Sequence, residues 1–181
     1  AVSFFARIML VLLGVRVQVN HRERLRRTGR AQLIVANHLS YLDILVISSL
    51  MPSVFITSVE LKRTALLGPL ARLSGSIFVE RRKPSGLKRE IGEIAQVLSQ
   101  GMPVAFFPEG TTSNGDRVQQ FKNSLFDAAI IARADLVPVC LRYTGVNGER
   151  LTDQNRDRVF YYGGVAFLNH FPNLLTLKLV D

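Results

Sequence analysis

The sequence predicts a single α/β domain in which a mixed, largely parallel sheet is covered by helices on both faces. Short runs rich in apolar and β-branched residues alternate with stretches of helical periodicity, and this alternation is typical of α/β layers. Several of the short runs are apolar without interruption, as in strands that are buried on both faces. The length of 181 residues fits one domain, and 48% apolar residues are enough for its core.

Seven short runs are predicted to be strands. They are residues 16–19, 32–36, 53–57, 76–80, 104–107, 137–142 and 159–162. The clearest helix is predicted over residues 85–100, because apolar residues recur there on one helical face and Gly101 follows. Helical patterns also cover residues 61–73 and 122–134.

The N-terminal segment is apolar but short. Its uninterrupted apolar run, residues 8–15, is well below the roughly 18–20 residues that a membrane-spanning helix needs. Arg7 and Arg16 flank this run. Two interpretations remain open, a core helix that leads into the first strand or a segment that lies in a membrane interface. For residues 1–19 we predict an apolar, membrane-associating segment together with the first strand.

The charge of the chain favours an anionic partner. The formal net charge is +9, from 23 basic and 14 acidic residues, which suits an anionic membrane surface, a phosphorylated substrate or nucleic acid. We expect no nucleic-acid partner, because no base-reading motif is present and aromatic residues are not interleaved with the arginine-rich residues 20–30.

Cysteine usage excludes two further kinds of site. Cys140 is the single cysteine, so no disulfide can form within the chain. Cys140 and the three histidines show no zinc-ligand spacing, and we expect no metal. Because Cys140 falls inside a predicted apolar strand, we interpret it as an inert core residue.

The strongest candidate chemistry lies in the segment that follows the strand at 32–36, where Asn37-His38 is followed by Asp43. On one continuous helix, five residues turn by about 500°, so His38 and Asp43 would lie on different faces. They meet only if His38 is in a loop and Asp43 is in the first turn of a helix. Ser40 matches a Ser-x-x-acid helix start and supports this geometry. A histidine oriented by a carboxylate is the base half of a catalytic triad; the alternative is a helix cap beside a loop histidine.

Three further segments carry groups that bind anions. Residues 107–111 (Phe-Pro-Glu-Gly-Thr) follow an apolar strand, and their glycine lets backbone N–H groups approach an anion. Residues 75–83 end a strand in three cations, Arg81, Arg82 and Lys83. Lys122 opens a predicted helix. Each segment also has an ordinary structural alternative: a turn for residues 107–111, a solvated strand end for residues 75–83 and a helix start at Lys122.

Taken together, these segments resemble the glycerophospholipid acyltransferases, in particular the bacterial 1-acylglycerol-3-phosphate acyltransferase type. Residues 37–43 match the family block Asn-His-x4-Asp, and residues 75–81 match Gly-x-Ile-Phe-x-x-Arg. Residues 107–111 match Phe-Pro-Glu-Gly-Thr, and residues 137–139 match a short apolar block around a proline. The order and spacing of the blocks agree over residues 37–139.

The resemblance implies a glycerolipid acyltransferase-like fold over residues 20–181, whose C-terminus we expect to be incomplete. It implies transfer of a fatty acyl group from acyl-CoA or acyl carrier protein to the hydroxyl of a lysophospholipid, most of all 1-acylglycerol-3-phosphate, with no cofactor besides the thioester donor. His38 would be the general base and Asp43 the carboxylate that orients it. The expected substrate-binding residues are Arg81, Arg82, Glu109, Gly110, Thr111 and Lys122, and those expected to hold an oxyanion or to position the pair are Asn37 and Ser40.

Thr112 departs from the family pattern, because many members have Arg at that position. The acceptor of a lyso-ornithine-lipid acyltransferase therefore stays open, and so do two rivals, a lipid hydrolase and a non-catalytic lipid-binding membrane module. Since the acceptor has a fatty tail and a charged head, we expect the protein at an anionic membrane surface. The expected location is the cytoplasmic face of the inner (plasma) membrane, with peripheral or monotopic attachment.

Overall fold

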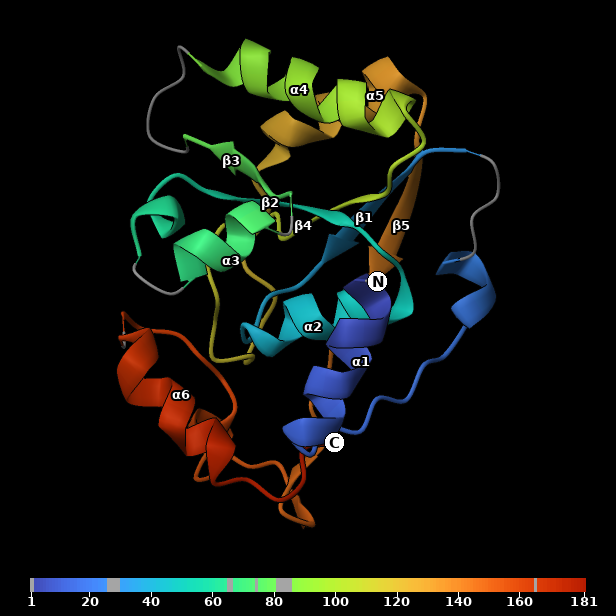
Figure 1. The fold of residues 1–181 in the computed structure, drawn as a ribbon. Coiled ribbons are helices and arrows are strands. Elements are labelled where there is room, and N and C mark those ends of the chain that lie inside the picture. The colour runs from blue at the N-terminus through green and yellow to red at the C-terminus, as the bar shows by residue number, and fades with distance from the viewer. Residues whose placement is uncertain (1, 26–29, 65–66, 74, 81–85, 165) are drawn as a thin grey trace.

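The computed structural model describes residues 2–25, 30–64, 67–73, 75–80, 86–164 and 166–181. Its centre is a five-stranded sheet in the order β3-β2-β4-β1-β5, and every pairing in this sheet is parallel. The strands are β1 (Gln32–Ala36), β2 (Val54–Ser58), β3 (Ile77–Val79), β4 (Val104–Phe106) and β5 (Asp135–Val139). Helices cover both faces of the sheet (Figure 1), so the predicted fold class is confirmed.

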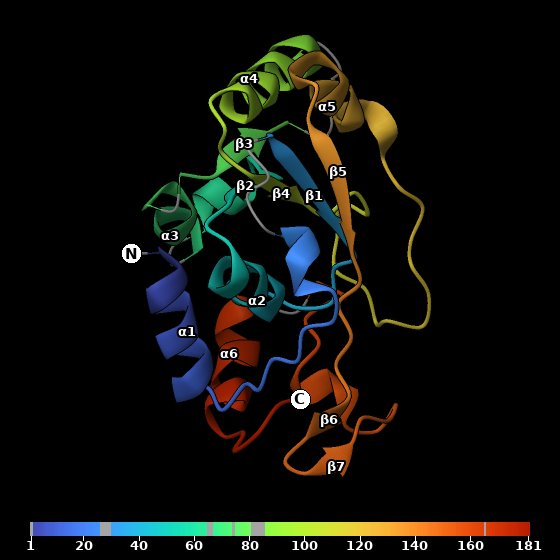
Figure 2. The same cartoon turned by 90° about the vertical axis from the view of Figure 1, so that its right-hand side faces the viewer.

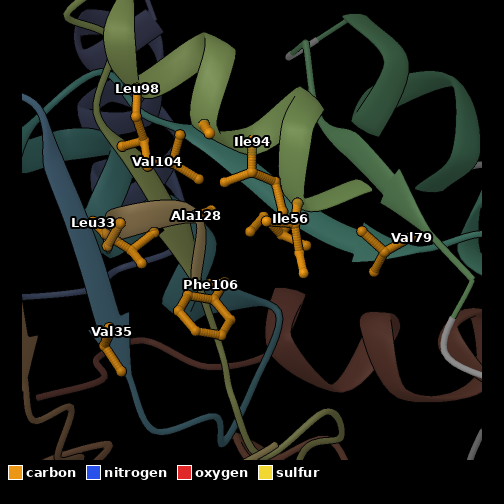
Figure 3. Packing of buried hydrophobic residues seen from close by; sticks show 12 residues of the cluster. Leu33, Val35, Ile56, Val79, Ile94, Leu98, Val104, Phe106 and Ala128 are labelled. Carbon is orange, nitrogen blue, oxygen red and sulfur yellow. The ribbon is translucent and has the colours of Figure 1, made fainter. Parts of the chain in front are cut away.

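The two faces of the sheet have separate buried cores. In β1, Leu33 and Val35 point to the cluster beneath α4 (Leu87–Ser99) and α5 (Asp127–Ala132), part of which is drawn in Figure 3. Ile34 and Ala36 point to the opposite cluster, which includes residues of α2 (Leu42–Leu50). Because both faces are covered, all five residues of β1 are buried, which explains why this strand has no polar alternation.

The other elements lie around this sandwich. They are α1 (Val2–Leu12), α3 (Leu67–Leu73), α6 (Phe167–Leu175), the short strands β6 (Gly145–Val146) and β7 (Glu149–Arg150), and the 3-10 helices η1 (Arg22–Leu25), η2 (Leu61–Arg63), η4 (Asn123–Phe126) and η5 (Arg156–Arg158). The segment after β5, with β6, β7 and α6, lies beyond the carboxyl ends of the strands in both views (Figures 1 and 2). A third cluster there joins Leu39 to Val159, Phe160 and Leu174.

Two of the seven predicted strands are wrong. Residues 16–19 form no strand; Val15, just before them, forms an isolated bridge with Val180. Residues 159–162 form no strand either, because Val159 and Phe160 bury their side chains in the third cluster instead of joining the sheet. Both runs have a composition typical of strands, but that composition indicates buried side chains as well as strand pairing.

The predicted helices differ mainly at their ends. The helix expected over 85–100 is α4, while residue 85 lies outside the described part of the chain. The pattern at 61–73 divides into η2 and α3, and the pattern at 122–134 divides into η4 and α5. The strand expected over 137–142 is β5, which begins at Asp135 and ends at Val139.

The N-terminal segment is helical. α1 packs on α2 through its buried residues Ala6 and Leu10, and the Arg7 Nε donates a 2.9 Å hydrogen bond to the Ser49 carbonyl oxygen. Its outer side leaves seven large apolar residues exposed, namely Val2, Phe4, Phe5, Ile8, Met9, Val11 and Leu12. Within the described ranges, no helix has the length and apolar character needed to cross a bilayer.

Candidate active site

His38 and Asp43 meet at the carboxyl end of β1. His38 lies in the loop after this strand and Asp43 lies in the first turn of α2. Their Nδ1 and Oδ2 atoms are 2.8 Å apart. Asp43 is fully buried, whereas 18% of the His38 side chain is exposed. The predicted contact is therefore confirmed, and the imidazole can be reached from solvent.

The Asp43 carboxylate accepts hydrogen bonds from two backbone groups and one phenol as well as contacting His38. Its Oδ2 accepts from the N–H of Leu39 at 2.7 Å and from that of Ser40 at 3.0 Å. Its Oδ1 accepts from the Tyr143 hydroxyl at 2.7 Å. With the carboxylate held in this way, His38 Nδ1 is the donor of the pair, and its Nε2 is left as the candidate base.

The His38 loop is also held from other sides. The imidazole stacks on Phe107, with ring centroids 3.8 Å apart and an interplanar angle of 8°. The His38 backbone N–H donates to Glu109 Oε1 at 2.8 Å, and the His38 carbonyl oxygen accepts from the Ser113 N–H at 3.0 Å. Both the ring and the main chain of His38 are thus fixed by residues that follow β4.

Glu109 bridges two loops through its carboxylate. Its Oε1 accepts from the His38 N–H, and its Oε2 accepts from the Gln119 N–H at 2.7 Å. The residue is only 4% exposed. Both oxygens of the carboxylate thus already accept bonds from the main chain. A contact between Glu109 and an acceptor substrate stays a prediction.

The other predicted substrate-binding residues are placed unevenly. Gly110 has a φ of 75°, and the Lys122 side chain lies directly over it, so that an added Cβ would come within 2.8 Å of Nζ. Thr111 is exposed beside them. Arg81 and Arg82 lie outside the described residues. The structure therefore brings Lys122 to the loop that contains Glu109 and Gly110.

Asn37 and Ser40 both contact the main chain, and the Ser40 side chain also hydrogen bonds to Tyr143. The Asn37 Nδ2 donates to the Leu141 carbonyl oxygen at 2.9 Å, and its Oδ1 accepts from the Leu141 N–H at 2.7 Å. This pair of bonds extends the β1–β5 pairing beyond the last ladder positions, Ala36 and Val139. Ser40 is fully buried, and its Oγ accepts a long bond of 3.4 Å from the Leu42 N–H. Of their two expected roles, the structure gives both residues contacts that suit positioning.

A cavity of about 450 Å³ is lined by residues that contact the pair, although neither His38 nor Asp43 is part of its lining. Its wall includes Leu39, Glu109 and Tyr143, each of which bonds to His38 or Asp43. Arg117 and Arg142 also line it, and neither guanidinium has an acidic partner within the described ranges. By contrast, the lining residues Asp116 and Asp153 both pair with Arg156. The two unpaired cations make the cavity suitable for an anionic group.

Sequence reasoning missed Tyr143, Arg142 and the packing role of Phe107. Tyr143 is 100 residues away from Asp43 in the chain, and no local pattern connects the two. Cys140 was wrongly interpreted as a core residue. It follows the end of β5, is exposed and lines the cavity, because the strand stops three residues earlier than its apolar run suggested.

Comparison with known proteins connects this geometry to one family. Residues 16–142 match the family model described as Acyltransferase. Several lyso-ornithine lipid O-acyltransferases are similar over nearly the whole chain. The protein from Rhizobium meliloti (strain 1021) is 37% identical over 93% of this chain and 59% of its own length, and that from Brucella abortus (strain 2308) is 33% identical over 99% and 68%.

A second group of relatives matches a shorter region. The 1-acyl-sn-glycerol-3-phosphate acyltransferase of Neisseria gonorrhoeae is 37% identical over 65% of this chain and 46% of its own length. Among solved structures, the 1-acyl-sn-glycerophosphate acyltransferase PlsC from Thermotoga maritima superposes with a TM-score of 0.60 at 25% identity, covering 75% of this chain and 54% of PlsC.

The chain thus spans about half to two thirds of the length of these relatives. The matched region contains His38, Asp43, Glu109 and the strands that carry them. The chain belongs to the Acyltransferase family, as its motifs indicated.

Proposed function

We propose that this protein transfers a fatty acyl group from a thioester to the hydroxyl of a lysolipid. The observation that carries the proposal is the 2.8 Å contact between His38 Nδ1 and the fully buried Asp43 carboxylate, on a partly exposed imidazole. A lipid hydroxyl is too weakly acidic to ionise at neutral pH, so it needs a base positioned in this way.

In the proposed reaction, His38 Nε2 takes the proton of the acceptor hydroxyl as its oxygen attacks the thioester carbonyl carbon. The C–O bond forms, the tetrahedral oxyanion collapses, and the C–S bond breaks to release the thiolate. The imidazolium then gives its proton to the thiolate sulfur. Asp43 orients the imidazole and stabilises the imidazolium, which contributes to a general-base gain of roughly 10²–10⁴-fold.

The transfer is proposed to be direct, with no acyl-enzyme. The thioester is already activated, and the sequence has no Gly-x-Ser-x-Gly nucleophile elbow. Acylated protein that accumulates in the absence of acceptor, at one acyl group per molecule, would contradict this step.

The acceptor is the finer part of the proposal. Lyso-ornithine lipid is favoured over 1-acylglycerol-3-phosphate because three acyltransferases named for it match 93–99% of this chain, and a fourth 61%, whereas those named for 1-acyl-sn-glycerol-3-phosphate match 65–72%. Thr112, which removes a cation found in many family members, supports the same choice. Arg117 and Arg142 in the neighbouring cavity are suited to an anionic group of either acceptor, the carboxylate of ornithine or the phosphate of 1-acylglycerol-3-phosphate. The second candidate is 1-acylglycerol-3-phosphate, as the motifs first indicated.

The proposed place of work is an anionic membrane surface on the cytoplasmic side. The exposed apolar side of α1 and the net charge of +9 both favour such attachment. Acyl-CoA and acyl carrier protein are both suitable donors, because each presents a fatty thioester.

The test is a panel of lysolipids supplied with acyl-CoA or acyl carrier protein, using the full-length wild type and His38→Ala. We expect a diacyl product with lyso-ornithine lipid from the wild type, and none above background from the variant. Release of free fatty acid without acceptor dependence would instead indicate a hydrolase. Lipid binding that is unchanged in His38→Ala, with no product from either protein, would indicate a non-catalytic module.

A further inference from the structure

The residue that reaches Asp43 from the greatest distance along the chain is Tyr143. It lies after β5, in the segment that continues past Leu141, and its hydroxyl donates to Asp43 Oδ1 at 2.7 Å. All the other bonds to this carboxylate, from His38, Leu39 and Ser40, go to Oδ2. Among the described residues, Tyr143 is therefore the donor that holds the second oxygen.

The Tyr143 hydroxyl is held as a donor. Burial, together with the Asp43 carboxylate beside it, raises the pKa of Tyr143 well above its usual range. At neutral pH the hydroxyl therefore keeps its proton, which can point to Oδ1. The tyrosine ring packs edge-on against Phe160, with centroids 5.6 Å apart, so the phenol has a fixed direction of approach.

We propose that Tyr143 is a positioning residue of the site, which holds Oδ1 of Asp43 so that Oδ2 stays directed at His38 Nδ1. Its effect on catalysis rests on the proposed acyl transfer, whereas its effect on His38 does not. Without the hydroxyl, Oδ1 loses the donor that the structure gives it, and the carboxylate is held through Oδ2 alone, by His38 and the backbone N–H groups of Leu39 and Ser40. The imidazole then keeps its partner oxygen, but the plane of the carboxylate is fixed from one side only.

The side-chain donor beside this contact is the Ser40 hydroxyl, which hydrogen bonds to Tyr143 itself; the remaining groups are directed elsewhere. The carboxylate of Glu109 binds the His38 main chain, and an acceptor cannot bond Oδ1 in place of a donor. The Tyr41 hydroxyl faces His170 Nδ1 at 3.1 Å. Ser40 directs its backbone N–H to Oδ2, the oxygen that His38 uses.

The experiment compares Tyr143→Phe with the matched variant Tyr162→Phe in the full-length protein. Tyr162 also donates its hydroxyl to a carboxylate, Asp157 Oδ1 at 2.6 Å, but this pair is exposed. In Tyr143→Phe we expect kcat to fall roughly tenfold or more, the loss that one hydrogen bond to a charged group produces. The KM for the lysolipid is expected to change less than about twofold, and Tyr162→Phe is expected to match the wild type.

A second readout does not need turnover. In ¹⁵N-histidine-labelled protein, the Nδ1 proton of His38 gives a resolved signal as long as it is hydrogen bonded to Asp43. We expect this signal to move, and to exchange faster with water, in Tyr143→Phe, while the signals of His21 and His170 keep their positions and report an intact fold. In an Asp43→Asn background, Tyr143→Phe should produce no further change at His38, because the hydroxyl acts through that carboxylate.

The outcomes separate the two proposals. An unchanged His38 signal and unchanged kcat in folded Tyr143→Phe overturn the role of Tyr143. A change at His38 that is just as large in the Asp43→Asn background also overturns it, because the effect then bypasses Asp43. If the His38 signal responds as expected but the wild type acylates no lysolipid, the proposed function fails and the role of Tyr143 in holding Asp43 stands.

Discussion

Asp43 has no exposed surface, yet its side chain carries a carboxylate. Such a group is tolerated in a protein interior only when its oxygens are hydrogen bonded. Here the bonds come from four donors, in His38, Leu39, Ser40 and Tyr143. Three of the four donors hold the carboxylate, and the fourth is the imidazole that it orients. The same arrangement therefore satisfies a buried acid and fixes a histidine.

Replacing Asp43 by Asn tests this arrangement at its centre. The amide keeps the size of the side chain. Its NH₂ group, however, faces a hydrogen-bond donor wherever it replaces a carboxylate oxygen, and the imidazole loses the carboxylate that fixes its tautomer. We expect kcat to fall by about 10⁴-fold, as for the equivalent change in a catalytic triad, in an acyl-transfer assay. Asp157→Asn at the exposed Tyr162 contact is the control, and a loss of the same size in the control would contradict the expectation.

At the level of single residues, the sequence predicted the part of the site that is local. His38 and Asp43 are five positions apart, so helix geometry alone limited how they can meet. The contact of Glu109 with His38 and that of Tyr143 with Asp43 join chain segments that are 71 and 100 residues apart. Spacing along the sequence has no information about such contacts, and only the packed sheet edge brings them together.

Three loops that follow parallel strands converge on the pair. The loop after β1 carries His38, the loop after β4 carries Glu109, and the segment after β5 carries Leu141 and Tyr143. Because β4, β1 and β5 are neighbours in a parallel sheet, their carboxyl ends share one edge. Side-chain bonds to the main chain, from Glu109 and Asn37, then join these loops to one another.

Glu109→Gln distinguishes loop bridging from substrate binding. The amide can accept only one of the two backbone bonds, from His38 or Gln119, and directs its NH₂ group at the other donor. We expect a loss of about 1–3 kcal/mol in the free energy of unfolding, measured with urea, and a lower kcat with little change in acceptor KM. The exposed Glu149→Gln is the control. A variant with wild-type stability and a raised acceptor KM would instead support direct contact with the lipid.

The secondary elements could be predicted where burial on both faces dictated the pattern. Apolar runs indicated the positions of all five strands of the sheet, most clearly at β1 and β4, in which every residue is buried; the edge strands β3 and β5 are buried only in part. The same reasoning was wrong at residues 159–162, where Val159 and Phe160 are buried in a loop under α6. A buried apolar run can be either a strand or a loop, and it becomes a strand only where a neighbouring strand is available for pairing.

Taken as a whole, the molecule presents one helix with an unusually apolar outer side. Phe4, Phe5, Val11 and Leu12 of α1 are all more than 60% exposed, although α1 is also packed on α2. Removing the helix would uncover α2, so substitutions on the outer side are the sharper test of membrane attachment.

We expect Phe4, Phe5 and Leu12, all replaced by Ser, to lower partitioning to anionic vesicles by tenfold or more. Each apolar side chain that enters the membrane contributes about 1.5–3 kcal/mol at full burial. The control replaces Ile130 and Ile131 by Ser; both residues are similarly exposed, on α5, which covers the other face of the sheet. Vesicle flotation measures both, and equal losses would contradict attachment through α1.

Alkaline pH should weaken the fold through its buried phenols. Burial raises the pKa of Tyr143 and of Tyr41 above the ordinary value of 10.0. Above about pH 10 the unfolded chain releases these protons while the folded chain keeps them, so the free energy of unfolding falls by about 1.4 kcal/mol per pH unit for each group. Urea titrations from pH 8 upward should show a shallower fall in Tyr143→Phe, and an identical slope would contradict the expectation.

The most direct measurement is the rate of acyl transfer to lysolipid by the full-length protein when His38 or His21 is replaced by Ala. His21 is exposed and outside the site. If the imidazole held by Asp43 is the base, His38→Ala lowers kcat by roughly 10²–10⁴-fold, and His21→Ala leaves the rate as it is. A folded His38→Ala protein that still forms diacyl lipid at the wild-type rate would contradict the account.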